Sequence, residues 1–189
     1  MKKDFIRVIE EDLIKVGYVL GNEKVLFVKC GQGGSVYGYD NKYLDLAWRI
    51  NEKYGYSAFV SEIADDGREA FEREMGIVKG LIGKNCKIYY LGISKGGLLG
   101  LWHGASDPSI EKMITVNAPL MINFHNKTRP SAMAFGRKRL TMVYGTLDPS
   151  YKFVPFIAPF ANAWIIEGAD HNLFGSDVSL DEIVEHLIN

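Results

Sequence analysis

Ile88-Tyr-Tyr-Leu-Gly-Ile-Ser-Lys-Gly-Gly97 is the stretch around which the rest of the chain can be arranged. Its first four residues, 88–91, are apolar or aromatic and predict a buried strand. A turn over 92–96 follows, and the apolar residues of 98–102 then predict a helix. The stretch therefore predicts a strand, a sharp turn and a helix in direct succession.

Ser94 lies at the tip of this turn, and its backbone must be strained for the chain to reverse so tightly. Gly92 and Gly96, two positions to either side, lack the side chains that would keep the strand and the helix apart. The N-terminus of the helix directs unpaired N–H groups and positive potential toward the serine oxygen. We predict that Ser94 is a nucleophile.

The sequence Gly92-Ile-Ser-Lys-Gly96 fits the pattern Gly-x-Ser-x-Gly, and here the chain resembles the α/β-hydrolase superfamily. Members of that superfamily carry the nucleophile, the acid and the histidine in this order along the chain. Here Ser94 is followed by an apolar run that ends at Asp148 and by another that leads into His171. The resemblance extends from about residue 25 to the end of the chain.

The rest of the chain alternates between predicted strands and predicted amphipathic helices, which is typical of the α/β class. Strands are predicted over residues 5–9, 13–20, 25–29, 57–63, 112–116, 140–144 and 164–167. Ser179 and Glu182 fit a capping box at the start of a terminal helix. We expect a single domain over 1–189 with a doubly wound, mostly parallel sheet and helices on both faces. Residues 120–139 are predicted to be irregular and have room for a minimal lid.

His171 is the predicted general base, since an imidazole titrates near neutral pH and can shuttle a proton. It follows a predicted strand in a loop, at the edge of the sheet where such folds carry their sites. His103 and His186 fall in predicted helices and are expected at the surface. His125 falls in the predicted lid and is expected to be solvated.

Asp148 is the predicted acid that orients the histidine and stabilises its charged form. An aspartate before a proline can instead start a turn. Some superfamily members place the acid one strand earlier, but that position here holds Asn117. Asp170 and Asp177 stay open as alternatives, although they lie close to His171 in sequence.

The resemblance also implies an oxyanion hole made of two backbone N–H groups. One is that of Lys95, directly after the nucleophile, and the other is that of Gln32, in the loop after the strand 25–29. Cys30 stands where family members often have histidine, which leaves open how this loop is braced. We expect Cys30 to be a small buried residue rather than a second nucleophile.

The same glycine-rich loop does not fit a nucleotide site. A dinucleotide fingerprint beginning at Gly31 would need a glycine where Val36 stands, and the chain has no Gly-Lys-Ser/Thr sequence. A group of basic residues near the predicted lid is interpreted as a solvated face, with attraction of an acidic substrate as the alternative. These residues are Lys127, Arg129, Arg137, Lys138 and Arg139.

The composition is that of a folded domain, with 189 residues, 47% hydrophobic residues and 24% charged residues. A net charge of −1 argues against nucleic acid as a partner. The two cysteines form neither a disulfide framework nor a zinc spacing, and no run is long enough to span a membrane. We expect a cytoplasmic protein that needs no metal or cofactor. The oligomeric state stays open.

Together these features predict a serine hydrolase that cleaves a carboxylic ester or thioester of a small molecule. Two alternatives remain. An amidase, peptidase or acyltransferase would use the same three side chains, and a binding protein could keep the fold without catalysis.

Overall fold

The computed structural model describes residues 4–189, so residues 1–3 of the predicted domain lie outside the described part. The strands are β1 (Arg7–Glu11), β2 (Ile14–Val19), β3 (Asn22–Lys29), β4 (Tyr56–Ser61), β5 (Lys87–Ile93), β6 (Ile110–Val116), β7 (Leu140–Gly145) and β8 (Asn162–Ile166). The helices are α1 (Lys42–Tyr54), α2 (Arg68–Ile82), α3 (Lys95–Gly104), α4 (Arg129–Phe135), α5 (Val154–Ile157) and α6 (Leu180–Ile188). Three short helical turns are η1 (Tyr39–Asn41), η2 (Phe124–Thr128) and η3 (Tyr151–Phe153).

All eight strands form one sheet in the order β1-β2-β4-β3-β5-β6-β7-β8. The β1–β2 and β2–β4 pairs are antiparallel, and every other neighbouring pair is parallel. The prediction of a mostly parallel sheet is therefore confirmed. Because the strands from β3 to β8 are parallel, the loops that follow them meet at one edge of the sheet.

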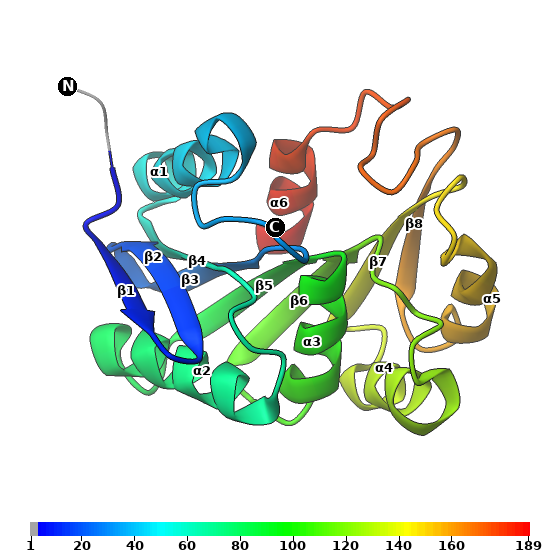
Figure 1. Ribbon diagram of the computed structural model, residues 1–189, viewed down its shortest axis with the longest axis horizontal. Helices are drawn as coiled ribbons and strands as arrows, with labels where there is room; N and C mark the ends of the chain where they lie inside the picture. The colour runs from blue at the N-terminus through cyan, green and yellow to red at the C-terminus, as the bar shows by residue number, and fades with distance from the viewer. Residues whose placement is uncertain (1–3) are drawn as a thin grey trace.

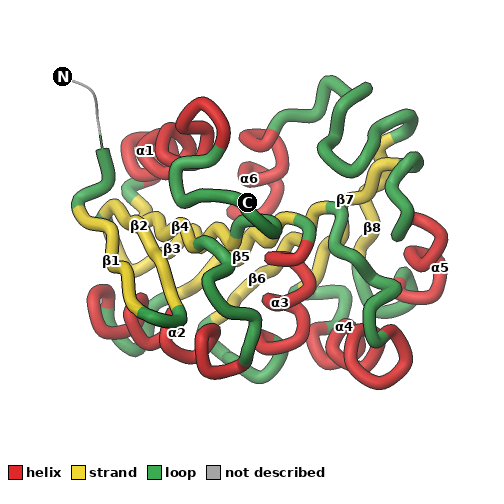
Figure 2. Tube along the Cα trace, in the orientation of Figure 1, coloured by secondary structure: helices red, strands yellow, loops and turns green. Residues whose placement is uncertain are grey.

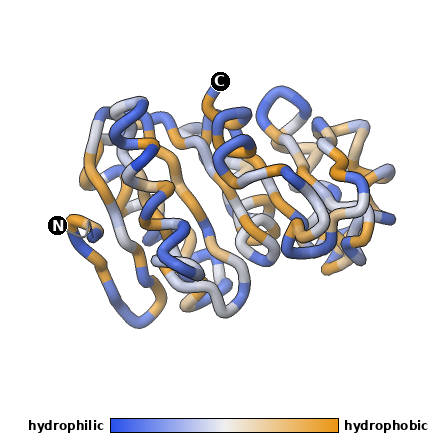
Figure 3. Tube along the Cα trace, turned by 90° about the horizontal axis from the view of Figure 1, so that it is seen from above, coloured by the Kyte–Doolittle hydropathy of each residue, from blue (hydrophilic) through white to orange (hydrophobic). Residues whose placement is uncertain are grey.

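Helices cover both faces of the sheet, as predicted (Figure 1). Helices α1 and α6 lie on one face, and α2, α3 and α4 lie on the other. Figure 2 shows the sheet as a continuous band between these two layers. Seen from above, hydrophobic segments run through the interior, while hydrophilic ones dominate the outer turns (Figure 3).

The central strand β3 contributes to both cores because its side chains alternate between the two faces. Leu26 and Val28 pack in the core under α1 and α6. Val25 and Phe27 pack in the core under α2, α3 and α4. All four are almost completely buried, and burying each such side chain stabilises the fold by about 1.5–3 kcal/mol.

The terminal helix α6 begins with the predicted capping box. The backbone N–H of Glu182 donates to Ser179 Oγ at 3.2 Å, and Ser179 N–H donates to Glu182 Oε2 at 2.7 Å. These two bonds satisfy donors that the first turn of a helix otherwise leaves open. The helix then packs Ile183, Val184 and Leu187 against the sheet.

The expectation that 120–139 is irregular is wrong, because η2 and α4 occupy most of it. Pro130 stands in the first turn of α4, where a missing N–H costs nothing, and Gly136 ends the helix. The residues that suggested an irregular segment therefore mark the two ends of a helix. Thr128 ties the segment to α3, since its hydroxyl accepts a hydrogen bond from Trp102 Nε1 at 3.0 Å.

The basic residues of this region do not form one solvated patch. The guanidinium of Arg139 donates to the carbonyl oxygen of Ile110 at 2.9 Å and fixes a loop at the far end of the sheet. The ammonium of Lys127 lies 4.2 Å from the ring centre of Trp102. The guanidinium of Arg129 lies 5.2 Å from the ring centre of Phe160. Three of the five basic residues thus have separate structural contacts.

Candidate active site

Ser94 connects β5 to α3. Its backbone has φ 50° and ψ −122°, a conformation that residues other than glycine rarely adopt. Its N–H donates to the carbonyl oxygen of Val116 at 2.7 Å, which fixes the turn to the end of β6. A Cβ atom at Gly92 would lie 2.4 Å from Gly97 Cα, and one at Gly96 would lie 2.3 Å from the carbonyl oxygen of Cys30. Both positions thus require glycine, as the motif predicts.

The structure brings Ser94, His171 and Asp148 into one row. His171 Nε2 lies 2.9 Å from Ser94 Oγ, and His171 Nδ1 lies 2.5 Å from Asp148 Oδ2. The side chain of Asp148 is 1% exposed, whereas that of His171 is 44% exposed. The row therefore runs from a buried carboxylate to a hydroxyl at the surface.

The chemistry of the partners fixes the tautomer of His171. An ionised carboxylate can only accept hydrogen bonds, so Nδ1 carries the proton that faces Asp148. In the neutral ring Nε2 is then an acceptor, and it can take the hydroxyl proton of Ser94. This arrangement suits the removal of a proton from the serine.

Asp148 has two partners, one for each carboxylate oxygen. It stands in the turn after β7, and its Oδ1 accepts a hydrogen bond from the backbone N–H of Ser150 at 2.7 Å. The other oxygen, Oδ2, faces His171. The turn role and the orienting role, which the sequence presented as alternatives, are thus compatible in one side chain.

Two residues that shape the loop around His171 were missed as positioning residues. Asn117 Nδ2 donates to the carbonyl oxygens of Asp170 at 3.1 Å and of His171 at 2.9 Å, and Asn117 Oδ1 accepts from Gly145 N–H. The carboxylate of Asp170 accepts from Asn172 N–H at 2.8 Å and so closes the loop on itself. The tendency of Asp to form such turns was the available signal. No signal in the sequence indicated the contacts of Asn117.

The resemblance implies an oxyanion hole made of the N–H groups of Lys95, which directly follows the serine, and of Gln32, which lines the same cleft. Lys95 is the first residue of α3, and Gln32 is exposed in the loop after β3. Within residues 4–189 neither backbone N–H has a hydrogen-bond acceptor. A Cβ atom at Gly31 would lie 3.4 Å from Ser94 Cβ, so the loop approaches the serine closely. The Lys95 ammonium forms an ion pair with Asp66 at 2.8 Å.

Cys30 is completely buried, as expected. Burial raises the pKa of its thiol to about 12, although the nearby charge of Lys29 opposes this shift. The Cys30 Sγ–H instead donates to the carbonyl oxygen of Ser35 at 3.4 Å. A thiol with such a pKa is almost entirely protonated at neutral pH and is a weak nucleophile.

An open cleft of about 860 Å³ lies above Ser94 and His171. Its walls come from the loop after β3, the start of α1, the ends of β5 and β6, and the segment 171–180. Tyr39 is 90% exposed and Phe174 is 72% exposed at its rim. Among the described residues that line this cleft, none comes from 120–139, so the predicted lid segment lies outside it.

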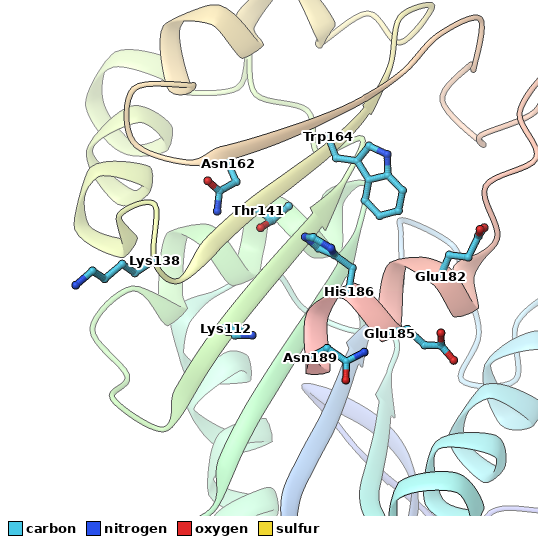
Figure 4. A pocket seen from close by; sticks show the side chains of 9 residues that line it. All are labelled: Lys112, Lys138, Thr141, Asn162, Trp164, Glu182, Glu185, His186 and Asn189. Atoms are coloured by element: carbon cyan, nitrogen blue, oxygen red, sulfur yellow. The ribbon is translucent and has the colours of Figure 1, made fainter.

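A second cleft lies between α6 and the last strands (Figure 4). The rings of Trp164 and His186 are 5.5 Å apart there, while Lys138 points away. Other polar groups around it already have structural partners, since Glu182 caps α6 and Glu185 pairs with Lys53. The walls of the two clefts share no residue.

The other histidines lie away from the row. His186 and His125 are exposed, as expected. The expectation for His103 is wrong, because its ring is half-buried against Phe71, at 5.9 Å between ring centres. Across residues 4–189 no group of three or more His, Cys, Asp or Glu side chains could hold a metal ion. No helix in that range is both long enough and apolar enough to cross a membrane.

Comparison with solved structures shows that the chain has the α/β-hydrolase fold. Est1E from Butyrivibrio proteoclasticus has 16% identity and a TM-score of 0.72, over 97% of this chain and 96% of that one. XC6422 from Xanthomonas campestris, described as an α/β serine hydrolase without a lid, has 15% identity and a TM-score of 0.69, over 96% and 93%. An α/β serine hydrolase homologue from Coxiella burnetii has 16% identity and a TM-score of 0.64, over 100% and 95%. No family model and no curated protein matches the sequence.

Proposed function

We propose that the protein is a serine hydrolase that cleaves carboxylic esters or thioesters through an acyl-enzyme on Ser94. The observation that carries this proposal is the row from Asp148 through His171 to Ser94, with contacts of 2.5 and 2.9 Å. Two of the structures with a similar fold are described as an α/β serine hydrolase and as an α/β serine hydrolase homologue, which gives the proposal further support.

In the proposed mechanism Ser94 Oγ attacks the carbonyl carbon of the substrate while His171 Nε2 takes its proton. Asp148 stabilises the imidazolium that forms. The negative charge on the carbonyl oxygen is bound by the N–H groups of Gln32 and Lys95. His171 then gives the proton to the leaving group, and a water molecule, deprotonated by the same ring, releases the acid.

The cleft above Ser94 supports a small-molecule acyl substrate. Its walls are apolar and aromatic near Ile93, Tyr43 and Leu173. Lys42 is the one lysine or arginine among the described lining residues, and no aspartate or glutamate lines the cleft. Such a surface favours an apolar or aromatic acyl group and tolerates a negative charge at the rim near Lys42.

The proposal is tested by labelling with a fluorophosphonate and by turnover of p-nitrophenyl butyrate. We expect mass spectrometry to locate the label on Ser94, and we expect Ser94→Ala to lose both labelling and turnover. Loss of the serine from such a row lowers kcat by about 10⁶-fold. Ser106→Ala is a matched control, because this exposed serine lies at the opposite end of the sheet.

Equal turnover in Ser94→Ala and in the unmodified protein would refute the proposal, and so would labelling elsewhere. Products formed from matched ester, thioester and anilide substrates separate an esterase from an amidase. Products formed in the presence of added alcohols identify an acyltransferase.

A further inference from the structure

A buried polar cluster, made of Lys29, Ser61 and Glu74, lies under the end of β3. The side chains of Lys29 and Glu74 are 3% and 1% exposed and form an ion pair. The Lys29 ammonium also donates to Ser61 Oγ at 3.1 Å and to the carbonyl oxygen of Glu62 at 2.6 Å. All three protons of the ammonium group are therefore used, which fixes its position.

Stability alone does not account for this cluster. Burial raises the pKa of Glu74, although Lys29 and Ser61 oppose the shift. Glu74 Oε2 has no hydrogen-bond partner among the described residues. A buried ion pair can often be replaced by apolar side chains without loss of stability, because removing two charges from water is costly.

The cluster and the adjoining residue Glu62 hold the two ends of the loop that contains Gln32. At the start of the loop, Cys30 N–H donates to the carbonyl oxygen of Ser61 at 2.9 Å. At its end, Val36 N–H donates to the carboxylate of Glu62 at 2.9 Å. Residues 61 and 62 thus receive both ends of the loop, and Lys29 binds both of these residues. Glu74, from α2, holds Lys29 in turn.

The start of this loop also lies against the turn that carries Ser94. A Cβ atom added at Gly96 would lie 2.3 Å from the carbonyl oxygen of Cys30 and 2.4 Å from that of Lys29. A small displacement of the end of β3 would therefore change the distance between the Gln32 N–H and Ser94. Stabilisation of an oxyanion depends on placing its donors within a few tenths of an ångström.

We propose that the Lys29–Ser61–Glu74 cluster positions the Gln32 N–H for the oxyanion. The proposal rests on the function proposed above and assigns these residues a positioning role, not a catalytic one.

The double variant Lys29→Met/Glu74→Leu separates positioning from stability. We expect its Tm to stay close to that of the unmodified protein, because the two charges are removed together. We expect kcat for p-nitrophenyl butyrate to fall about 10- to 100-fold with little change in KM. This loss is smaller than the loss in kcat caused by removing one oxyanion donor completely, because the donor is displaced and not deleted. The pH profile should keep its shape, since His171 and Asp148 lie outside the cluster. If kcat is unchanged while Tm is retained, the proposal is wrong.

One further measurement and two further variants complete the test. Amide hydrogen exchange over residues 30–36 does not depend on turnover, and we expect it to be faster in the double variant. Unchanged exchange would refute the positioning role even if the protein were not an esterase, whereas inactivity of the unmodified protein would refute only the proposed function. If the double variant does not fold, the same measurements of kcat and amide hydrogen exchange are made on Glu74→Gln. Lys79→Met is the control, because it removes an ion pair with Asp107 at the other end of the sheet.

Discussion

The carboxylate of Asp148 is the residue-scale feature on which the orientation of His171 depends. Its two oxygens have different partners, the backbone of the turn and the ring nitrogen, so the carboxylate cannot rotate without losing one of them. Its side chain is almost completely buried. A hydrogen bond to a buried, fixed carboxylate is stronger than one made in water.

Asp148→Asn should lower kcat about 10⁴-fold, because an amide can present a donor to Nδ1 and so favour the wrong tautomer of His171. Circular dichroism should show an unchanged fold, and turnover of p-nitrophenyl butyrate measures the loss. Asp177→Asn is the matched control. This aspartate was one of the two acids left open by the sequence, and it is exposed. Equal losses in the two variants would contradict the assignment of Asp148.

The three residues of the row could be named from the sequence because each follows a recognisable strand. Ser94 had its flanking glycines, and Asp148 and His171 each followed an apolar run. The Lys29–Glu74 pair could not be found in this way, since its partners are 45 residues apart. The available signal was a charge at each of two buried positions, one at the end of a strand and one on the apolar face of a helix.

At the scale of elements, Asn117 joins the ends of two strands to the loop that carries His171. It follows β6, accepts from Gly145 N–H at the end of β7, and donates to two carbonyl oxygens of the His171 loop. Its own backbone has φ 47°, a conformation that asparagine tolerates better than most residues. A side chain of 1% exposure thus fixes three segments relative to one another.

Asn117→Ala should destabilise the protein by roughly 1–3 kcal/mol, because it leaves buried backbone groups without partners. It should also lower kcat, since the His171 loop loses two of its bonds. Thermal unfolding and ester turnover measure the two effects. Asn162→Ala is the control, because its amide donates to the Arg137 carbonyl oxygen at an exposed edge strand. Full activity in Asn117→Ala would show that the loop is held by other contacts.

Most strands and helices could be predicted because their hydrophobic periods are regular. The segment 120–139 could not, because its two helices have only 5 and 7 residues, which is too short to show a regular hydrophobic period. Its structure depends on tertiary contacts, such as the bond between Trp102 and Thr128. The contacts of the basic residues in this segment could not be predicted for the same reason, because their partners lie on other elements.

At the scale of the whole molecule, His103 lies within one layer of helices, where α3 packs against α2. Burial lowers the pKa of its ring, and the charge of Lys127 lowers it further, while contact with Asp66 opposes the shift. The buried Nε2 has no partner among the described residues. The folded state therefore binds a proton at this site less readily than the unfolded chain does.

This difference predicts an acid-sensitive stability. The contribution of His103 is complete above the unfolded pKa of about 6.5 and is lost as the pH falls toward the lower folded pKa. Tm should drop less between pH 7.5 and 5.5 in His103→Gln than in the unmodified protein. Lys127→Met should also reduce the drop, since it removes a nearby positive charge. Identical drops in all three proteins would contradict this account.

The backbone of Ser94, with φ 50° and ψ −122°, has a consequence for engineering. Glycine adopts this conformation without penalty, so Gly at position 94 would make a more heat-resistant and inert protein. A screen for thermostability that ignores turnover would therefore select against the one hydroxyl on which the proposed chemistry depends.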